Sequence, residues 1–409
     1  MNNLSKNEML VGVDIGTSKV VAIVAETRGE DDIEIIGLGT HPSKGLKNGV
    51  VVDIESTTYA IKKSIAEAEA MAGCHIGSCY VGISGSHIRG LNSEGVVPIK
   101  DGEVRYGDVD RVIETAQAMA IPADQRLLHV LPRDYIIDKQ DGIKEPLGMA
   151  GSRLEAKVHL VTCSENSSLN IHKCINASGL DVEAFVLEQL ASSYSVLTND
   201  ERDLGVCLID IGGGTTDMAV FMDGSIAFTD VIPIAGDHVT NDIAQALRTP
   251  PTQAEHIKQR YGCAVSSLTK PEEVMMVPGM GGRPERELSR QALADVLERR
   301  YVEIFSMAQQ KLSLSGFESL IPAGVVLTGG AAKVEGASEL AEEIFHAPVR
   351  LGSPHSIEGF SEIINNPIYA TSVGLLLYGQ KQLQEDHLNY IHRDKNILNR
   401  LSRWFGGNL

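Results

Sequence analysis

The chain has 409 residues, of which 43% are hydrophobic, and a formal net charge of −18. This length exceeds what one hydrophobic core supports, so we expect at least two domains around a cleft. The negative charge argues against nucleic acid as a partner, because binding to a phosphate backbone depends on a basic surface. The six cysteines contain no CxxC pair and suit a reducing cytosol. With neither an apolar leader nor a stretch of ~20 apolar residues, we expect a protein that stays in the cytoplasm.

The first predicted element is a β-hairpin over residues 9–26. One apolar run ends near Asp14, and a second begins at Val20. The tip between them consists of Gly16, Thr17, Ser18 and Lys19. Glycine permits backbone angles that let successive N–H groups point into one anion site. Lys19 adds a charge suited to phosphate, and a solvated turn lysine is the alternative.

A strand at 33–39, a helix at 55–71 and a strand at 79–84 follow. Residues 85–163 then differ in character, because they are rich in Gly, Pro and charge. They contain one helical pattern, at 108–120, and three candidate strands, at 96–99, 127–137 and 154–163. We expect a small inserted α/β domain that serves as an interaction module, since no acids, histidines or nucleophiles stand at chemical spacing.

A helix at 167–178 and a strand at 182–186 lead to a connecting helix at 187–197, which carries Glu188 at its start. This carboxylate could orient or deprotonate a water near a γ-phosphate. It could equally be no more than a favourable charge at a helix N-terminus.

Residues 206–221 repeat the first hairpin. A β run ends at Asp210, and a second run begins at Met218. The tip consists of Gly212, Gly213, Gly214, Thr215 and Thr216, followed by Asp217. A Gly-rich turn with a capping aspartate would explain either copy alone. Two copies with acids at equivalent positions favour two related domains that together clamp a phosphate and its cation.

The second half begins with a strand at 225–233 and a helix that Gly236 and Asp237 open. We expect this helix start to place free N–H groups and a carboxylate at the edge of the cleft. The pattern Thr252-Gln-Ala-Glu255 is a capping box, so Glu255 is explained by its own helix. Lys258 lacks such an explanation, and a solvated lysine is the alternative. Residues 263–284 read as a loop and 289–312 as a long helix. Five arginines gather around the start and middle of that helix, namely Arg283, Arg286, Arg290, Arg299 and Arg300. They could dock an acidic peptide or pair with neighbouring surface acids.

A strand at 325–328 ends at Gly329 and Gly330, as expected where backbone approaches a flat base or ribose. The remaining elements are a helix at 334–345, a strand at 348–351, a core helix at 366–378 and a polar linker at 380–392.

The end of the chain, 394–407, has an amphipathic helical pattern. Its apolar face spans roughly 120° and consists of Ile397, Leu398, Leu401, Trp404 and Phe405, with Lys395, Arg400 and Arg403 outside it. We predict a helix that lies in the plane of a membrane, and docking on the protein's own core is the alternative. One such helix binds lipid weakly, so stable attachment implies many copies on a polymer.

The order of two phosphate hairpins, connecting helix, Gly236-Asp237 and strand-end Gly329-Gly330 is similar to the actin, Hsp70 and sugar-kinase superfamily over residues 9–378. With the insertion, the short 40–55 loop and the amphipathic tail, the chain resembles the FtsA family of bacterial cell-division proteins along its whole length. The implied fold is α/β, with two duplicated RNase H-like domains, a small inserted subdomain and a C-terminal amphipathic helix. The expected parts are subdomain 1A (1–84 and 164–200), 1C (85–163), 2A (201–233 and 313–365), 2B (234–312), a returning helix (366–379), a flexible linker (380–393) and the membrane helix (394–407).

The resemblance implies an ATP-binding protein, at most a slow ATPase, that forms actin-like filaments on the cytoplasmic face of the inner membrane at the division site. It implies that the two tips hold phosphates, that Asp14 and Asp210 hold Mg²⁺ through water, and that Gly329 and Gly330 contact adenosine. Gly236, Glu255 and Lys258 would flank the ribose and base. The Arg286–Arg300 region would dock the C-terminal tail of FtsZ, and 85–163 would bind later divisome proteins. The chain departs from many relatives in having Gln189 after Glu188 where they have proline.

Two other functions are compatible with the same fold. A small-molecule kinase would need an acidic general base between the domains, and the inserted segment supplies none. An adaptor of pilus assembly, like the PilM family, would have no need of its own membrane helix. The amphipathic tail therefore discriminates among the three.

Overall fold

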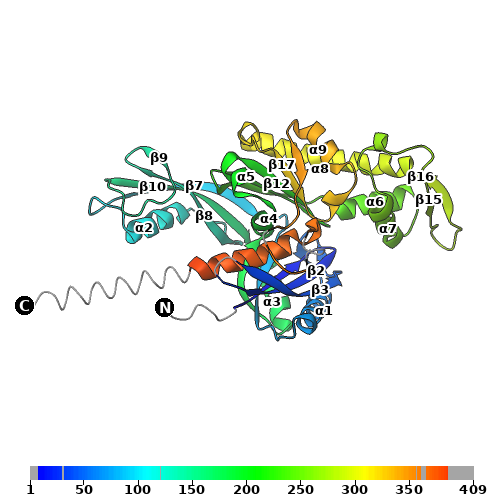
Figure 1. The fold of residues 1–409 in the computed structure, drawn as a ribbon, viewed down its shortest axis with the longest axis horizontal. Helices are drawn as coiled ribbons and strands as arrows, with labels where there is room; N and C mark the ends of the chain where they lie inside the picture. The colour runs from blue at the N-terminus through cyan, green and yellow to red at the C-terminus, as the bar shows by residue number, and fades with distance from the viewer. Residues whose placement is uncertain (1–7, 30–31, 120, 356, 361–364, 386–409) are drawn as a thin grey trace, which may run out of the picture.

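Two five-stranded sheets with the same topology form the centre of the molecule (Figure 1). The computed structural model describes residues 8–29, 32–119, 121–355, 357–360 and 365–385. The first sheet has the order β11-β6-β1-β2-β3 and the second β14-β13-β12-β17-β18. In each sheet three consecutive strands form an antiparallel meander, and two later strands add in parallel. The predicted duplication is confirmed.

The first domain is a sheet covered on both faces. Its elements are β1 (Met9–Ile15), β2 (Lys19–Thr27), β3 (Ile33–Pro42), β4 (Leu46–Lys47), β5 (Val50–Val51), α1 (Ile54–Ala72), β6 (Ser78–Ile83), α3 (Glu165–Ala177), β11 (Asp181–Leu187) and α4 (Glu188–Val196). Because both faces are covered, β2 reads as an almost continuous apolar run. Alternate residues face α1 and α3 on one side and the C-terminal helix, 370–385, on the other.

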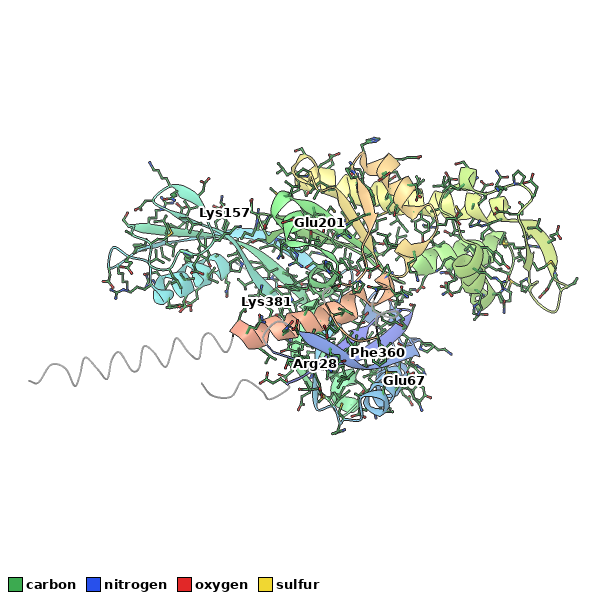
Figure 2. The ribbon with its side chains drawn as sticks, in the orientation of Figure 1. Arg28, Glu67, Lys157, Glu201, Phe360 and Lys381 are labelled. Carbon is green, nitrogen blue, oxygen red and sulfur yellow. The ribbon has the colours of Figure 1, made fainter. Side chains whose placement is uncertain are left out.

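The second domain repeats this plan. Its elements are α5 (Asn199–Leu204), β12 (Val206–Ile211), β13 (Thr216–Met222), β14 (Ser225–Ile232), β17 (Val325–Thr328), α9 (Ala337–Phe345) and β18 (Val349–Leu351). A helical subdomain between β14 and β17 consists mainly of α6 (Gly236–Ala246), α7 (Pro251–Tyr261) and α8 (Arg290–Ser315). The Arg350 guanidinium donates to the Glu201 carboxylate at 2.6 and 2.7 Å and so holds the edge strand β18 against α5. Figure 2 labels Glu201 in the second domain.

Two sequence predictions about this part of the chain are wrong. The segment 263–284 contains strand β15 (Val274–Val277), which pairs with β16 (Arg286–Ser289). Its alternation of buried and exposed side chains covers only four residues, too few for a recognisable period. The predicted linker is wrong for 380–385, because the C-terminal helix continues to residue 385 and Leu383 packs against the core. The predicted membrane helix at 394–407 lies outside the described residues.

The insertion is a separate α/β unit with its own core, as predicted. It consists of β7 (Arg89–Pro98), α2 (Tyr106–Gln117), β8 (Gln125–Ile137), β9 (Gln140–Ile143) and β10 (Arg153–Ser164). The strands form an antiparallel sheet in the order β7-β10-β8-β9, in which β9 was not predicted. Figure 1 shows this unit at one end of the molecule, with the β15–β16 hairpin at the other. Within the described residues, no helix has the length and apolarity to cross a membrane.

The insertion is seated on the second domain, although the chain enters it from the first. Strands β7 and β8 contact β14. At this seam His159 is 1% exposed. Its Nδ1 lies 2.8 Å from Asn92 Oδ1 and its Nε2 lies 2.9 Å from Thr229 Oγ1. Asn92 also donates to the Ala227 carbonyl at 3.1 Å, so polar contacts join the two units.

This seam should make the protein sensitive to acid. Burial, with a further contribution from Arg133, lowers the pKa of His159 to about 4 from an ordinary 6.5. The unfolded chain therefore binds this proton more strongly, and stability is lost as the pH falls from 6.5 towards 4. We expect the free energy of unfolding to be about 2 kcal/mol lower at pH 5 than at pH 7.5 because of His159. His159→Gln should abolish this part of the decrease. Urea unfolding at both pH values checks this, and equal losses in the two proteins would contradict it.

Candidate functional site

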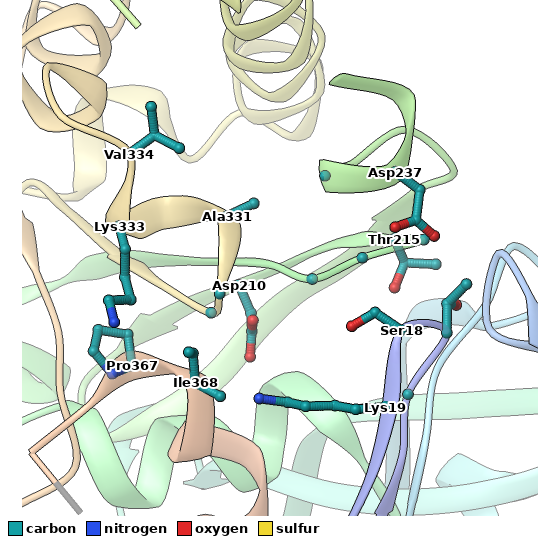
Figure 3. Close-up of a pocket in the computed structure, with 18 of the residues that line it drawn as sticks. Ser18, Lys19, Asp210, Thr215, Asp237, Ala331, Lys333, Val334, Pro367 and Ile368 are labelled. Carbon is teal, nitrogen blue, oxygen red and sulfur yellow. The ribbon is translucent and has the colours of Figure 1, made fainter. Parts of the chain in front are cut away.

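A cleft of ≈ 550 Å³ lies between the two domains, where the two hairpin tips approach each other (Figure 3). It collects nearly all the residues that the sequence analysis assigned to phosphate, cation and nucleoside. These are Asp14, Gly16, Thr17, Ser18, Lys19, Glu188, Asp210, Gly212, Gly213, Gly214, Thr215, Gly236, Glu255, Lys258, Gly329 and Gly330. Thr216 is the exception. Its hydroxyl donates to the Ile234 carbonyl at 2.7 Å and serves the second domain's core.

The two tips have the same turn. In the first, the Gly16 N–H donates to the Lys19 carbonyl at 3.0 Å, and in the second the Gly212 N–H donates to the Thr215 carbonyl at 3.0 Å. Glycine is required where the tips meet, because a Cβ on Gly214 would lie 2.4 Å from Thr17 Oγ1. The backbones of the two domains can therefore approach a common ligand from opposite sides.

The second tip is held against the start of α6. The Gly236 and Asp237 N–H groups donate to the carbonyls of Gly212 and Gly213 at 3.1 and 2.8 Å. On the other side of the tip, Gly329 has a φ of +89°, and a Cβ there would lie 2.3 Å from Asp210 Oδ1. The second tip is therefore held in a fixed position between the start of α6 and Gly329.

The predicted capping box is wrong. Helix α7 begins at Pro251 with Pro250 as its N-cap, so Glu255 lies within the helix and turns into the cleft. Burial opposes the charge of Glu255, but Lys258 and the hydrogen bonds from Lys258 and Thr240 hold its pKa below the ordinary value. Lys258 is not a solvated lysine. It is 7% exposed and donates to the Gly236 carbonyl at 3.0 Å, to Thr240 Oγ1 at 2.8 Å and to Glu255 at 2.7 Å.

Four carboxyl groups gather at the floor of the cleft, of which Asp210 and Asp217 are buried and Asp14 and Glu188 are half-buried. Burial, followed by the charges of Asp217 and Asp14, raises the pKa of Asp210 to about 7. Burial raises the pKa of Asp14 to about 6 against the opposing effect of Lys19. Burial and the three aspartates raise the pKa of Glu188 well above its ordinary value. This excess of acidic groups is a site that a cation would stabilise.

The donor set fits a hydrated cation better than a tightly coordinated one. Among the described residues, no group of three or more His, Cys, Asp or Glu side chains has the arrangement of a complete metal site. Mg²⁺ keeps several waters and is commonly bound through one or two carboxylates together with the phosphates of a ligand. Asp14 and Asp210, in the cleft between the tips, suit that mode.

Sequence reasoning missed part of the cleft wall. The missed residues include Gly49, Asp217, Ala331, Lys333, Val334, Pro367, Ile368 and Thr371, and several of them are labelled in Figure 3. The Asp237 carboxylate, expected at the edge of the cleft beside Gly236, does line it. Asp217 directly follows the predicted residues of the second tip and was visible in the sequence as an acid beside them. The segment 367–371 contains no acid or glycine tip that would have marked it in the sequence. In the structure the Thr371 hydroxyl donates to Asp210 at 3.2 Å.

The arginines around α8 do not form one open cluster. Arg300 donates to Asp242 at 2.6 and 3.0 Å and to Glu303 at 2.5 Å. Arg286 donates to the Leu247 carbonyl, whereas Arg299 is exposed. Arg290 lines the cleft and pairs with Glu273 and Glu335. Charge pairing within the protein therefore accounts for Arg290 and Arg300 in this structure.

Two duplicated domains with facing glycine turns and buried acids define a protein of the actin-like ATPase fold. Solved structures share this fold. A PilM–PilN type IV pilus biogenesis complex covers 92% of this chain and 99% of its own at a TM-score of 0.68 and 16% identity. MreB5 of Spiroplasma citri bound to AMPPNP covers 94% and 99% at a TM-score of 0.57 and 17% identity.

Sequence comparison is more specific. The family model for cell division protein FtsA matches residues 207–374, and that for the SHS2 domain inserted in FtsA matches 85–162. Cell division protein FtsA of Pseudomonas aeruginosa is 58% identical over 416 residues, covering 100% of both chains. The protein of the same name from Escherichia coli K12 is 46% identical over 396 residues, covering 95% of this chain and 93% of its own. The chain belongs to the FtsA family of cell division proteins.

Proposed function

We propose that this chain binds Mg·ATP in the interdomain cleft, forms actin-like filaments on the cytoplasmic face of the inner membrane, and anchors FtsZ there during division. The observation that carries the proposal is the pair of identical turns facing each other across buried acids. Glycine turns whose N–H groups face the cleft bind an anion, and the nearby acids bind a cation, so this arrangement suits a polyphosphate with its cation better than an uncharged ligand.

Different residues of the cleft would bind different parts of Mg·ATP. The two tips and Lys19 would hold the phosphates, and Asp14 and Asp210 would hold Mg²⁺ through water. Mg²⁺ would neutralise the charge between phosphates and aspartates. Glu255, kept ionised by Lys258, would accept from the ribose. Gly329 and Gly330 would face the adenosine, as would Ala331 and Val334 beside them in the cleft.

Hydrolysis would be slow at best. A general base must be deprotonated at working pH, and burial among aspartates favours the neutral form of Glu188. Calorimetric titration of the full chain with ATP, with and without Mg²⁺, tests the nucleotide assignment. Binding that is tighter with Mg²⁺ supports it, and absence of binding under both conditions would overturn it.

The tether to the membrane is assigned to residues 394–409, on sequence grounds. An apolar face flanked by lysine and arginine binds the headgroup region of an anionic bilayer. In a vesicle sedimentation assay with Mg·ATP, we expect the full chain to pellet with anionic liposomes and a chain ending at residue 393 to remain in the supernatant. Equal sedimentation of the two chains would refute the tether and leave room for a PilM-like adaptor.

The C-terminal tail of FtsZ is assigned to the surface around Arg300, on α8. An acidic tail would compete with Asp242 and Glu303 for this guanidinium. We expect Arg300→Glu to weaken binding of an FtsZ tail peptide about tenfold or more, measured by fluorescence anisotropy. Arg153→Glu, on the inserted domain, is the matched control with the same charge change. Equal affinities for wild type and Arg300→Glu would place the tail elsewhere.

The inserted domain would recruit later divisome proteins. It has its own core and lies at one end of the molecule, whereas β16, which directly precedes α8, lies at the other (Figure 1). Exposed apolar side chains on β7, Leu91 and Val96, are 42% and 44% accessible. A partner could therefore bind there without displacing FtsZ.

A further inference from the structure

Ser84 connects the first domain to the inserted domain. It follows the last residue of β6 and directly precedes the inserted domain matched at 85–162. It is 3% exposed, and its hydroxyl donates to Asp217 Oδ1 and lies 3.5 Å from Thr215 Oγ1. The entry to the inserted domain therefore reaches across the cleft to the second hairpin.

Both oxygens of Asp217 are held, one from each domain. Ser84 of the first domain binds Oδ1, and Thr215 of the second domain donates to Oδ2 at 2.8 Å. Asp217 lines the cleft among the other acids. Its carboxylate cannot rotate without breaking one of these bonds, so Ser84 sets its orientation.

A short turn reinforces this junction. The Gly49 N–H, between β4 and β5, donates to Thr17 Oγ1 of the first tip at 3.2 Å. A Cβ on Gly49 would lie 3.0 Å from the Ser84 carbonyl oxygen, and one on Gly214 would lie 3.0 Å from the Asn48 Cα. The turn is thus packed between both hairpin tips and the root of the inserted domain.

The inserted domain contacts the same β-meander at a second point. Asp217 stands on β13, and Thr229, the partner of His159, stands on the adjacent strand β14. The entry and exit of the domain are themselves joined, because the Ser164 N–H donates to His87 Nδ1 at 3.4 Å. A movement of the second hairpin relative to the first domain must therefore strain the Ser84 bond or shift the seam at His159.

We propose that Ser84 is a positioning residue of the nucleotide cleft that acts through Asp217, and that it links nucleotide binding to the seating of the inserted domain on β14. This rests on the proposed function, since it concerns the same cleft. Coupling between two sites is reciprocal. A ligand that reseats the inserted domain therefore changes the affinity for nucleotide by the same factor as nucleotide changes the affinity for that ligand.

The test uses the full chain, four single variants and the double variant that combines Ser84→Ala with Thr229→Val. Ser84→Ala removes the hydroxyl, and Ser84→Thr retains it. Ser86→Ala is the matched control, because Ser86 is exposed two residues further on. Thr229→Val loosens the far seam without touching the cleft. Titration calorimetry gives the affinity for Mg·ATP, and hydrogen exchange with and without Mg·ATP reports the protection of β7 and β14.

We expect Ser84→Ala to bind Mg·ATP about tenfold more weakly, as for loss of a hydrogen bond to a charged group, and to lose the ATP-dependent protection of β7 and β14. Ser84→Thr should restore both, and Ser86→Ala should match wild type. Thr229→Val should weaken Mg·ATP binding, with little further loss in the Ser84→Ala background, because the two act through one linkage.

Wild-type affinity and protection in Ser84→Ala would overturn the positioning role. Unchanged affinity in Thr229→Val, or additive losses in the double variant, would overturn the linkage. If the wild type binds no Mg·ATP, the proposed function itself fails, and this outcome is distinct from a wild type that binds while the variants do not differ.

Discussion

Gly374→Ala is expected to destabilise the protein by about 3 kcal/mol or more, because overpacking at a backbone contact has no side chain that can move aside. Gly374 lies on the C-terminal helix where it crosses α4. A Cβ at this position would lie 1.8 Å from the Ala191 carbonyl oxygen and 2.3 Å from its carbon. The two helices must separate to accept it. Urea unfolding followed by circular dichroism measures the loss.

The same separation should weaken nucleotide binding. Helix α4 begins with Glu188, and the C-terminal helix supplies Thr371 to the cleft. Gly107→Ala is the matched control, since Gly107 also lies in a helix, α2, but has no atom within 4 Å of a built Cβ. It should gain up to about 1 kcal/mol from helix propensity. If Gly374→Ala unfolds at the same midpoint urea concentration as the wild type, the close crossing of the two helices is refuted.

Local patterns were sufficient for the strands of the two five-stranded sheets and for the glycine tips. A β run that ends in Asp and glycine carries its conformation in adjacent residues, so both hairpins and their residues in the cleft could be predicted. The duplication followed from comparing Asp14 with Asp210. The prediction that Thr216 lies in the cleft was wrong because side chains alternate between the two faces of a strand. At the start of β13 the Thr216 hydroxyl donates to Ile234, away from the cleft.

Other features depend on contacts that no local pattern contains. Thr252 and Glu255 match a capping box, but Pro250 and Pro251 start the helix earlier, and proline is favoured in the first turn. Lys258 is buried only because α6 lies against α7 and offers it Gly236 and Thr240. The contact from Thr371 to Asp210 joins residues 161 apart. The continuation of the last helix to 385 depends on the core that Leu383 meets.

Asp210→Asn should change stability and ligand affinity in opposite directions. At pH 8, where a carboxyl group with a pKa of about 7 is mostly ionised, the wild type carries this charge buried beside Asp14 and Asp217. Asparagine has the same shape and can still accept from Thr371. We expect the ligand-free variant to be more stable by roughly 1–2 kcal/mol, because a repelled buried charge is replaced by a neutral amide. Urea unfolding without nucleotide measures this gain.

The affinity of the same variant for Mg·ATP should fall about 100-fold, the upper range for loss of an outer-shell metal partner, whereas its affinity for ATP without Mg²⁺ should not fall. Asp223→Asn is the control, because Asp223 is exposed in the β13–β14 turn at a positive φ of 50° that asparagine tolerates. Calorimetry with and without Mg²⁺ separates the two effects. A variant that keeps the wild-type preference for Mg·ATP would show that Asp210 does not hold the cation. A variant less stable than wild type would show that the acids at the cleft floor do not repel one another, so that the clamp needs no cation to be stable.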